Sequence, residues 1–337
     1  MKRKSIYVAI IFSIIFIVSH CTQQKDFPVL KGPYLGQKPP GMMSEIFAPG
    51  IISREFDELN SVFSPDGNEF YFSIKLPIDV QHTILSMNRI NNVWTKPAVV
   101  SFSGEYSDAD PAFSHDGKKL FFISRRPIPG MGESEEDWDI WVVERTDNNW
   151  AEPKNLGAPV NSDEMEIYPS VARNDTLYFC SARSGGLGGD DIYRSRFING
   201  KYAKPENLGD KVNSKYGEGD IFIALDESYI IFCSGRPGGF GNGDLYISFR
   251  HQDGTWTKAI NMGEKINSSY TEYCPYMSPD GKFLFFTSYR KPAKNYMLNP
   301  LTYDEIMEIY QSPQNGLGDI YWVDSKIIEE LKPKELK

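Results

Sequence analysis

The sequence predicts an all-β protein, a five-bladed β-propeller of four-stranded antiparallel blades. Three observations carry this prediction. One block of residues recurs five times along the 337-residue chain, each block contains short apolar runs separated by turn signals, and a segment before the first block matches the missing end of a repeat. Regular repetition of a unit of fifty-odd residues with several short strands is typical of propeller blades.

The repeated block opens with a carboxylate and returns through an apolar, aromatic run. Its five carboxylates are Glu58, Asp108, Glu166, Glu218 and Glu272, which are 50, 58, 52 and 54 residues apart. Five residues before each carboxylate stands a turn residue: Ser53, Ser103, Asn161, Asn213 and Asn267. Asp-Gly pairs at 66–67, 116–117 and 280–281 separate the two runs in three blocks. Asp-Gly is a strong hairpin signal, so each block should form two buried antiparallel strands.

The remaining strands of each blade follow the same logic. A third strand should begin at Asp139, Asp191, Asp244 and Asp319, and a fourth should carry Trp94, Trp150, Tyr202 and Trp256. Only four copies of the fourth strand lie between the five blocks, and residues 46–53 resemble the missing copy. We therefore expect the N-terminal strand to close the ring in the last blade, which removes exposed edges. A six-bladed ring is the weaker alternative.

The N-terminus predicts export. Three basic residues at 2–4 precede an uncharged apolar run over 6–18, which suits a signal peptide better than a membrane-spanning helix. Cys21 follows this run, as in the lipobox of bacterial lipoproteins, although His20 replaces the usual small residue. We expect a signal peptide over 1–20, a lipidated N-terminus and flexible tether over 21–44, and the propeller over 45–337. Secretion without a lipid and an uncleaved anchor are the alternatives.

The motifs Ser-Pro-Asp-Gly, Leu-Tyr-Phe-x-Ser, Asp-Ile-Tyr, Asn-Leu-Gly and Val-Asn-Ser resemble the TolB-type propeller repeats. They are most similar to the repeats of Bacteroidetes envelope lipoproteins, and the resemblance spans about residues 45 to 325. It implies the propeller fold and an outer-membrane lipoprotein that faces either the periplasm or the cell surface. It implies little about a ligand.

Composition argues against several classes of function. The net charge of −9 lacks the basic footprint of a nucleic-acid-binding protein. Beyond Cys21 the chain has three cysteines, Cys180, Cys233 and Cys274, which we interpret as small buried fillers. No Cys/His cluster has the spacing of metal ligands, so neither a metal site nor another cofactor is expected.

The charged residues of the repeat are the first candidate site. The carboxylates begin the first strands, and Arg126, Arg183, Arg236 and Arg290 end the second strands, so both sets belong to one face of the ring. They could form a charged mouth that binds a peptide, a glycan or a cation on the axis. Internal pairing is the alternative. Leu76 replaces the arginine and Thr83 the third-strand Asp in the same repeat, which favours pairs such as Arg183 with Asp191.

Two loops outside the repeat are the second candidate site. Residues 127–138 carry Glu133, Glu135, Glu136 and Asp137 ahead of Trp138. Residues 291–318 form an insertion in which Thr302 and Glu305 make a capping box for a short helix with Tyr303 and Tyr310. Long loops on a rigid scaffold commonly carry function, although both loops could instead form a lid over the tunnel.

These observations predict a non-catalytic propeller of the cell envelope. We expect a monomer that is anchored through a lipid on Cys21 and binds an envelope protein or a glycan such as peptidoglycan through its loop-rich face. The alternative is a glycoside hydrolase or lyase that uses carboxylates of the mouth, which requires two carboxylates about 5–9.5 Å apart.

Overall fold

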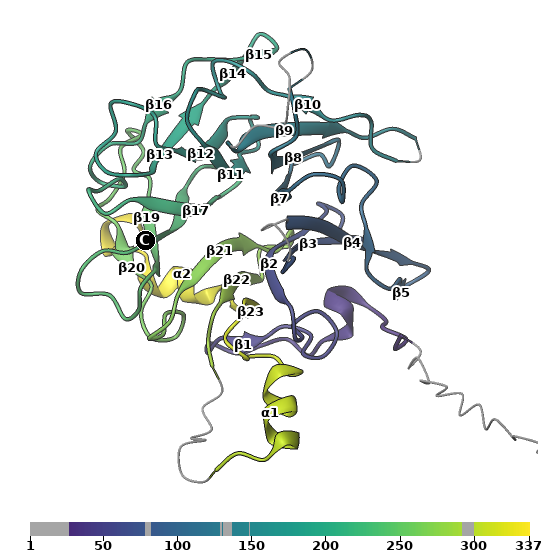
Figure 1. The fold of residues 1–337 in the computed structure, drawn as a ribbon. Helices are drawn as coiled ribbons and strands as arrows, with labels where there is room; N and C mark the ends of the chain where they lie inside the picture. The colour runs from purple at the N-terminus through teal and green to yellow at the C-terminus, as the bar shows by residue number, and fades with distance from the viewer. Residues whose placement is uncertain (1–26, 78–81, 129, 131–136, 148, 292–299) are drawn as a thin grey trace, which may run out of the picture.

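The structure is a computed structural model that describes residues 27–77, 82–128, 130, 137–147, 149–291 and 300–337. The expected signal peptide, Cys21 and the three glutamates of the 127–138 loop lie outside these residues. Five sheets surround a common axis and form a closed ring, as predicted (Figure 1). Within the described part of the chain, no helix is both long and apolar enough to cross a membrane.

The first blade contains β2 (Asp57–Phe63), β3 (Glu69–Lys75), β4 (His82–Ile90), β5 (Val93–Trp94) and β6 (Ala98–Val99). The second contains β7 (Asp108–Phe113), β8 (Lys119–Ser124), β9 (Asp139–Glu144) and β10 (Lys154–Asn155). The third contains β11 (Glu166–Val171), β12 (Leu177–Ser181), β13 (Asp191–Ser195) and β16 (Glu206–Asn207), with a side hairpin of β14 (Phe197–Ile198) and β15 (Lys201–Tyr202).

The fourth blade contains β17 (Glu218–Ile223), β18 (Tyr229–Ser234), β19 (Asp244–Phe249) and β20 (Ile260–Asn261). The fifth combines β21 (Glu272–Met277), β22 (Phe283–Ser288) and β23 (Asp319–Asp324) with β1 (Glu45–Ile46) from the other end of the chain. The helices are η1 (Pro33–Gly36), α1 (Tyr303–Tyr310), α2 (Lys326–Leu331) and η3 (Lys334–Leu336). In every blade the strands pair antiparallel.

The Asp-Gly turns join the first two strands as the sequence predicts. At the first of them Asp66 accepts hydrogen bonds from the Ser64 hydroxyl at 2.6 Å and the Asn68 amide at 3.0 Å. Gly67 has a φ of 69°, a conformation that side chains with a Cβ adopt rarely. The turn is therefore fixed by its own side chains.

The position predicted for the fourth strand is confirmed in the first blade, where Trp94 lies in β5 next to β4, and was wrong by a few residues in the other blades. There Trp150, Tyr202 and Trp256 pair with residues just after the third strand, in a hairpin that extends beyond the blade. The outer strand of those blades is the next short segment, β10, β16 or β20, and in the first blade β6 also pairs with β4. Pro97, Pro153 and Pro205 lie between the hairpin and that strand. Because proline lacks an N–H, it ends the hairpin pairing and the chain then crosses to the blade edge.

The predicted closure of the ring is confirmed. Glu45 and Ile46 of β1 pair with Trp322 and Tyr321 of β23, and the two segments lie side by side in Figure 1. Next to β1, the fully buried ring of Phe47 contacts several aromatic rings, including that of Trp322 at a centroid distance of 5.1 Å. The outer strand of the last blade is thus covered as well as paired.

The prediction of a flexible tether up to residue 44 was wrong for residues 27–44. Leu30 and Leu35 are buried in the core cluster between the last and first blades. The Trp94 indole donates a hydrogen bond of 2.7 Å to the Gly32 carbonyl, and the Tyr34 hydroxyl donates one of 2.6 Å to Asp280. The apolar residues of this segment are too few to show a period, but they are enough to pack across a blade junction.

Candidate functional site

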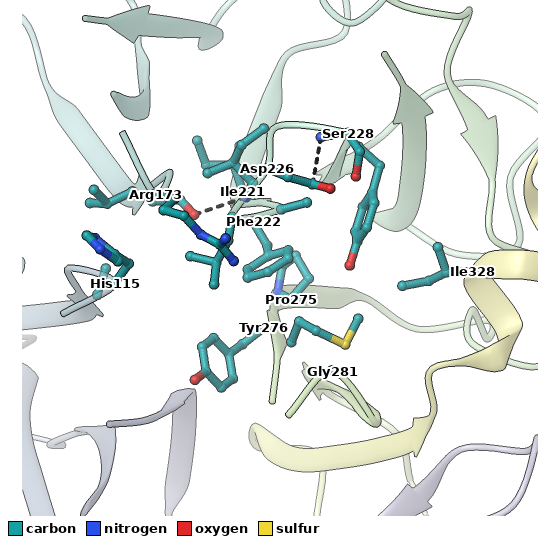
Figure 2. A pocket seen from close by; sticks show the side chains of 18 of the residues that line it. His115, Arg173, Ile221, Phe222, Asp226, Ser228, Pro275, Tyr276, Gly281 and Ile328 are labelled. Atoms are coloured by element: carbon teal, nitrogen blue, oxygen red, sulfur yellow. Dashed lines mark hydrogen bonds between the residues drawn. The ribbon is translucent and has the colours of Figure 1, made fainter. Parts of the chain in front are cut away.

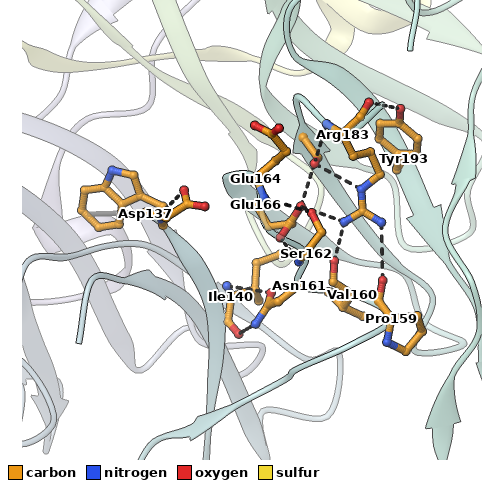
Figure 3. A network of polar contacts seen from close by, with 12 residues as sticks. Asp137, Ile140, Pro159, Val160, Asn161, Ser162, Glu164, Glu166, Arg183 and Tyr193 are labelled. Carbon is orange, nitrogen blue, oxygen red and sulfur yellow. Dashed lines mark hydrogen bonds and ion pairs between the residues drawn. The ribbon is translucent and has the colours of Figure 1, made fainter. Parts of the chain in front are cut away.

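Each arginine at the end of a second strand pairs with the carboxylate that begins the first strand of its own blade. Figure 3 shows the arrangement in the third blade, where Arg183 donates to Glu166 at 2.8 Å and to the Pro159 and Val160 carbonyls. Ser162 and Ser181 also donate to this carboxylate. The carboxylate is therefore satisfied inside the blade by one cation and two hydroxyls.

The same pairing recurs in three more blades: Asp108 with Arg126, Glu218 with Arg236, and Glu272 with Arg290. The four carboxylate side chains are 0% exposed and the four arginines 10–17% exposed, so these groups are not arranged around an open charged mouth. In each blade the guanidinium also lies near an aromatic ring on the second strand and another on the third. The geometry supports internal pairing, because buried ion pairs with additional hydrogen bonds need no ligand.

The partner named in that alternative was wrong. Asp191 does not pair with Arg183. It accepts hydrogen bonds from the Leu187 amide at 2.6 Å and the Asn207 side chain at 2.8 Å. The aspartate that opens the third strand therefore anchors the glycine-rich loop and the outer strand, and Asp244 does the same in the fourth blade.

The asparagine five positions before the carboxylate ends a turn, as predicted, in three blades, and its side chain has a further structural role. Asn213 is buried, and its amide group accepts from the Ile192 N–H at 2.9 Å and donates to the Ile192 carbonyl at 3.0 Å. Asn161 and Asn267 make the same two bonds to Ile140 and Leu245. A side-chain amide thus replaces a backbone partner for the third strand.

The first blade departs from this pattern. Glu58 is 0% exposed, and its Oε1 atom has no hydrogen-bond partner among the described residues. Its Oε2 atom accepts only from the Arg54 amide, at 3.2 Å. Burial, with smaller contributions from the charges of nearby acids, raises the pKa of Glu58 to about 9. This carboxyl is therefore protonated at neutral pH.

A second candidate site lies on the axis, two residues after each repeated carboxylate. At this position the first strand bulges, and all five residues have φ between 47° and 56°: Asn60, Asp110, Tyr168, Asp220 and Cys274. They line a cavity of about 1590 Å³. It extends to the side of the ring that carries the Asp-Gly turns, where His115, Arg173 and Asp226 also line it (Figure 2). This is the face opposite to the buried ion pairs.

The two acids of this axial ring are buried, and the charge of Asp220 acts on Asp110. Burial raises the pKa of Asp220 to about 7, and burial together with the charge of Asp220 raises the pKa of Asp110 well above its usual range. Cys274 donates to Asp220 at 3.0 Å and the Tyr168 amide donates to Asp110 at 3.3 Å. Sequence reasoning missed these residues because they differ from blade to blade. Their constant offset from the repeated carboxylate was the available signal.

The loop candidates lie on the face that carries the ion pairs. Trp138 is half-buried, with the Arg125 guanidinium 4.7 Å from its ring centroid and His82 at its edge. The predicted helix is confirmed as α1, with the Thr302–Glu305 capping box in place. None of its residues is buried, and Tyr303 and Tyr310 are 73% and 69% exposed. Figure 1 shows α1 projecting from the ring beside the last blade.

The cysteines of the propeller and its possible metal ligands are the remaining candidates for a site. Cys180 and Cys274 are buried and Cys233 is partly buried, all with free thiols, in agreement with a packing role. Within the ranges that the structure describes, no group of three or more His, Cys, Asp or Glu side chains is arranged to hold a metal ion.

Solved propellers share this architecture at low sequence identity. A protein described as TolB from Agrobacterium tumefaciens is 14% identical with a TM-score of 0.48, over 80% of this chain and 90% of that one. TolB from Acinetobacter baumannii is 14% identical with a TM-score of 0.45, over 80% and 57%. An α-L-arabinofuranosidase from Lactobacillus brevis is 12% identical with a TM-score of 0.48, over 80% and 91%. No family model and no curated protein matches the sequence.

Proposed function

We propose that this protein is a non-catalytic binding propeller of the cell envelope, which holds a partner protein against the face that carries α1. In this proposal a lipid on Cys21 anchors the chain to the outer membrane, and residues 27–44 fix the propeller close to the anchor. The export signal and the TolB-type repeats of the sequence support the location. The single observation that carries the binding role is the exposure of α1.

An isolated helix of eight residues gains little stability from its own hydrogen bonds, and most helices in proteins are stabilised by packing an apolar face. α1 has apolar residues but none of them is buried. Ile306 is 36% exposed between the two exposed tyrosines. Aromatic residues that stay exposed on a rigid scaffold are the side chains that most often dominate protein interfaces.

The insertion is held firmly at its C-terminal end. The Gln314 amide donates to Asp319 at 2.6 Å, and the Gln314 side chain donates to the Tyr321 hydroxyl at 2.7 Å. Asn315 donates to the Glu55 carbonyl at 3.3 Å, which ties the insertion to the first blade. The structure therefore presents α1 from an anchored base, and this supports a role in docking.

The charge of α1 indicates the chemistry of the partner. The helix carries Asp304, Glu305 and Glu308 and no basic residue. A partner surface that is apolar at its centre and basic at its rim would complement it, and its association rate should fall as salt is added. We therefore commit to a basic protein rather than a glycan as the ligand of this face.

The test is capture from detergent-solubilised envelope, followed by reconstitution with the purified candidate. The bait is the full chain, compared with the triple variant Tyr303→Ser, Ile306→Ser and Tyr310→Ser. Leu187→Ser with Phe240→Ser is the matched control, because these two side chains are also about half exposed but lie in the glycine-rich loops. We expect the purified partner to bind the wild type and the control equally and the triple variant at least tenfold more weakly. Equal binding by all three baits would disprove docking through α1.

A glycoside hydrolase or lyase is the second candidate, and one observation favours it. Asp110 and Asp220 lie in the large axial cavity with raised pKa values, and such enzymes use two carboxylates held in different protonation states. The repeated carboxylates are less suitable because four are paired with arginine. Release of reducing ends or unsaturated sugars from envelope polysaccharide by wild type, but not by Asp110→Asn or Asp220→Asn, would support this candidate over the first.

A further inference from the structure

The first blade contains a cavity where the other four blades hold an arginine. The cavity has a volume of about 510 Å³, and its walls include Ile51, Ile52, Glu58, Phe72, Ile74 and Leu85. It lies on the same face of the ring as α1. Arg54 and Phe56 also line it, and the neighbouring Glu55 carbonyl accepts the hydrogen bond from Asn315 of the insertion.

Most contacts of Arg183 in the third blade have a counterpart in this cavity, except the one to the Ser181 hydroxyl at 3.2 Å, because Ile74 stands at that position. Arg183 donates to Glu166 and to the Pro159 and Val160 carbonyls, and it lies 5.0 Å from the Phe179 centroid and 5.2 Å from that of Tyr193. In the repeat, Glu58 aligns with Glu166, and Ile51 and Ile52 align with Pro159 and Val160, whose carbonyls accept from Arg183. Phe72 aligns with Phe179 and Leu85 with Tyr193. The first blade thus has the carboxylate, the two carbonyls and one of the two aromatic rings of the arginine site, but not the arginine itself.

Two substitutions explain the vacancy. Leu76 occupies the position of Arg183 and is not among the residues that line the cavity. Ile74 replaces Ser181, whose hydroxyl donates to the carboxylate in the third blade. As a result the fully buried Oε1 atom of Glu58 has no partner in the described part of the chain. A buried acceptor left unpaired costs stability, so its retention needs a reason.

We propose that the first blade is a receptor for the guanidinium group of an arginine side chain, supplied by the basic partner that docks on α1. This inference rests on the proposed function for the source of the arginine, but the pocket itself is defined by the fold. Glu58 would accept the two-pronged hydrogen bond, the Ile52 carbonyl would accept a further N–H, and the Phe72 ring would lie against the guanidinium plane. The internal arginines of the other blades use a carboxylate, a carbonyl and an aromatic ring in the same positions, together with a serine hydroxyl and a second ring that the first blade lacks.

The surroundings favour a guanidinium over other cations. Phe56, Phe72, Ile74 and Leu85 give the cavity apolar walls, and a guanidinium is more weakly hydrated than an ammonium and stacks on aromatic rings. Glu55, Asp57 and Asp319 add negative charge around Glu58. Two cations of the chain line the cavity, Arg54 and Lys96, and the Arg54 guanidinium is engaged at 3.1 Å by Glu55 and lies 5.4 Å from the Phe56 centroid.

The test uses the folded full chain and a small probe, so it does not depend on finding the partner. N-acetyl-arginine amide is titrated at pH 8 while the thermal midpoint and NMR shifts are followed, and N-acetyl-citrulline amide is the uncharged control of the same shape. Glu58→Gln removes the carboxyl group, which has to give up its proton to become the anionic acceptor of the probe. The double variant Ile74→Ser, Leu76→Arg restores the residues of the other blades and should fill the cavity from within.

We expect the arginine probe, but not the citrulline probe, to raise the thermal midpoint of the wild type. Glu58→Gln should weaken binding at least tenfold, and the double variant should bind no probe and melt at a higher temperature than the wild type. Equal effects of the two probes on the wild type, or unchanged binding by Glu58→Gln, would overturn the proposal even if the double variant fails to fold. Probe binding without capture of a partner by α1 would instead refute the proposed function and leave the pocket in place.

Discussion

At the scale of single residues, the glutamates that begin the first strand of two blades, Glu166 and Glu58, have different electrostatic surroundings. Glu166 has an arginine and two serine hydroxyls as donors, whereas Glu58 has a single backbone N–H. Both side chains are fully buried. An ionised carboxylate in the interior needs a paired cation, and without one it takes up a proton instead. The same residue type is therefore paired with an arginine in one blade and is an unpaired, protonated carboxyl in another.

This difference predicts opposite effects of two identical substitutions. In the unfolded chain Glu58 ionises near pH 4.5, but in the folded protein it keeps its proton up to about pH 9. Unfolding therefore releases a proton between these values, and the free energy of unfolding falls as the pH rises through this window. This loss of stability amounts to about 1.4 kcal/mol per pH unit above pH 4.5, and Glu58→Gln removes it. The substitution should therefore stabilise the protein by up to about 5 kcal/mol at pH 8 relative to its effect at pH 4.

Glu166→Gln is the matched control. It leaves Arg183 buried without a counter-charge, so it should destabilise the protein by about 3 kcal/mol at neutral pH. Urea denaturation of both variants at pH 4 and pH 8 checks the pair. A pH-independent effect of Glu58→Gln, or a neutral Glu166→Gln, would contradict the assignment of the two states.

At the scale of secondary-structure elements, the side chains of Asn161, Asn213 and Asn267 act as part of the sheet. The Asn213 amide satisfies both backbone groups of Ile192, and its Nδ2 also donates to Asn207 at 2.9 Å. Asn213→Ala should therefore lower the free energy of unfolding by roughly 2–3 kcal/mol, because two buried backbone groups lose their partner. Gln252→Ala, at an exposed position, should change it by less than about 0.5 kcal/mol. Urea midpoints measure both, and equal midpoints would refute the role of Asn213.

The same elements show what the sequence could and could not predict. The hairpins, the β1 closure and α1 were predictable because Asp-Gly, the repeat offset and the capping box are local signals. The strands assigned to Trp150, Tyr202 and Trp256 were misplaced because these residues form a hairpin just after the third strand, which no local rule distinguishes from a blade edge. The docking of Leu30 and Leu35 depends on a groove between two blades and left no periodic signal.

The candidate site was predictable only in part for a related reason. The repeated acids and arginines could be found in the sequence because they recur. Their burial then showed that they pair inside each blade and have a structural role. Leu76 at the position of the repeated arginine indicated that no arginine pairs with Glu58. Whether another side chain fills the space beside Glu58 depends on packing. The axial ring of Asp110 and Asp220 depends on a bulge that turns these residues toward the axis, and backbone bulges are not encoded by a residue type.

At the scale of the whole molecule, the ring should depend on its N-terminal segment. Removing residues 27–46 deletes β1 and exposes the edge of β23 together with part of the junction core. We expect a lower thermal midpoint and concentration-dependent self-association through the free edge. Calorimetry and analytical ultracentrifugation of the truncated and full chains check this outcome. A truncated chain that stays monomeric and keeps its midpoint would show that closure is dispensable.

The closure also orders events during synthesis. Ser53 and Ile320 exchange two hydrogen bonds across a sequence separation of 267 residues, so the first strand to leave the ribosome waits for the last one. The inner strands of each blade pair with neighbours in sequence and can assemble early, whereas the final junction carries the loop-closure entropy of nearly the whole chain. Under the proposed function, a chain anchored through Cys21 would thus be tethered before the ring closes. Until β23 arrives, the apolar side chains of residues 27–52 lack part of the core against which they pack, and this surface is open to aggregation.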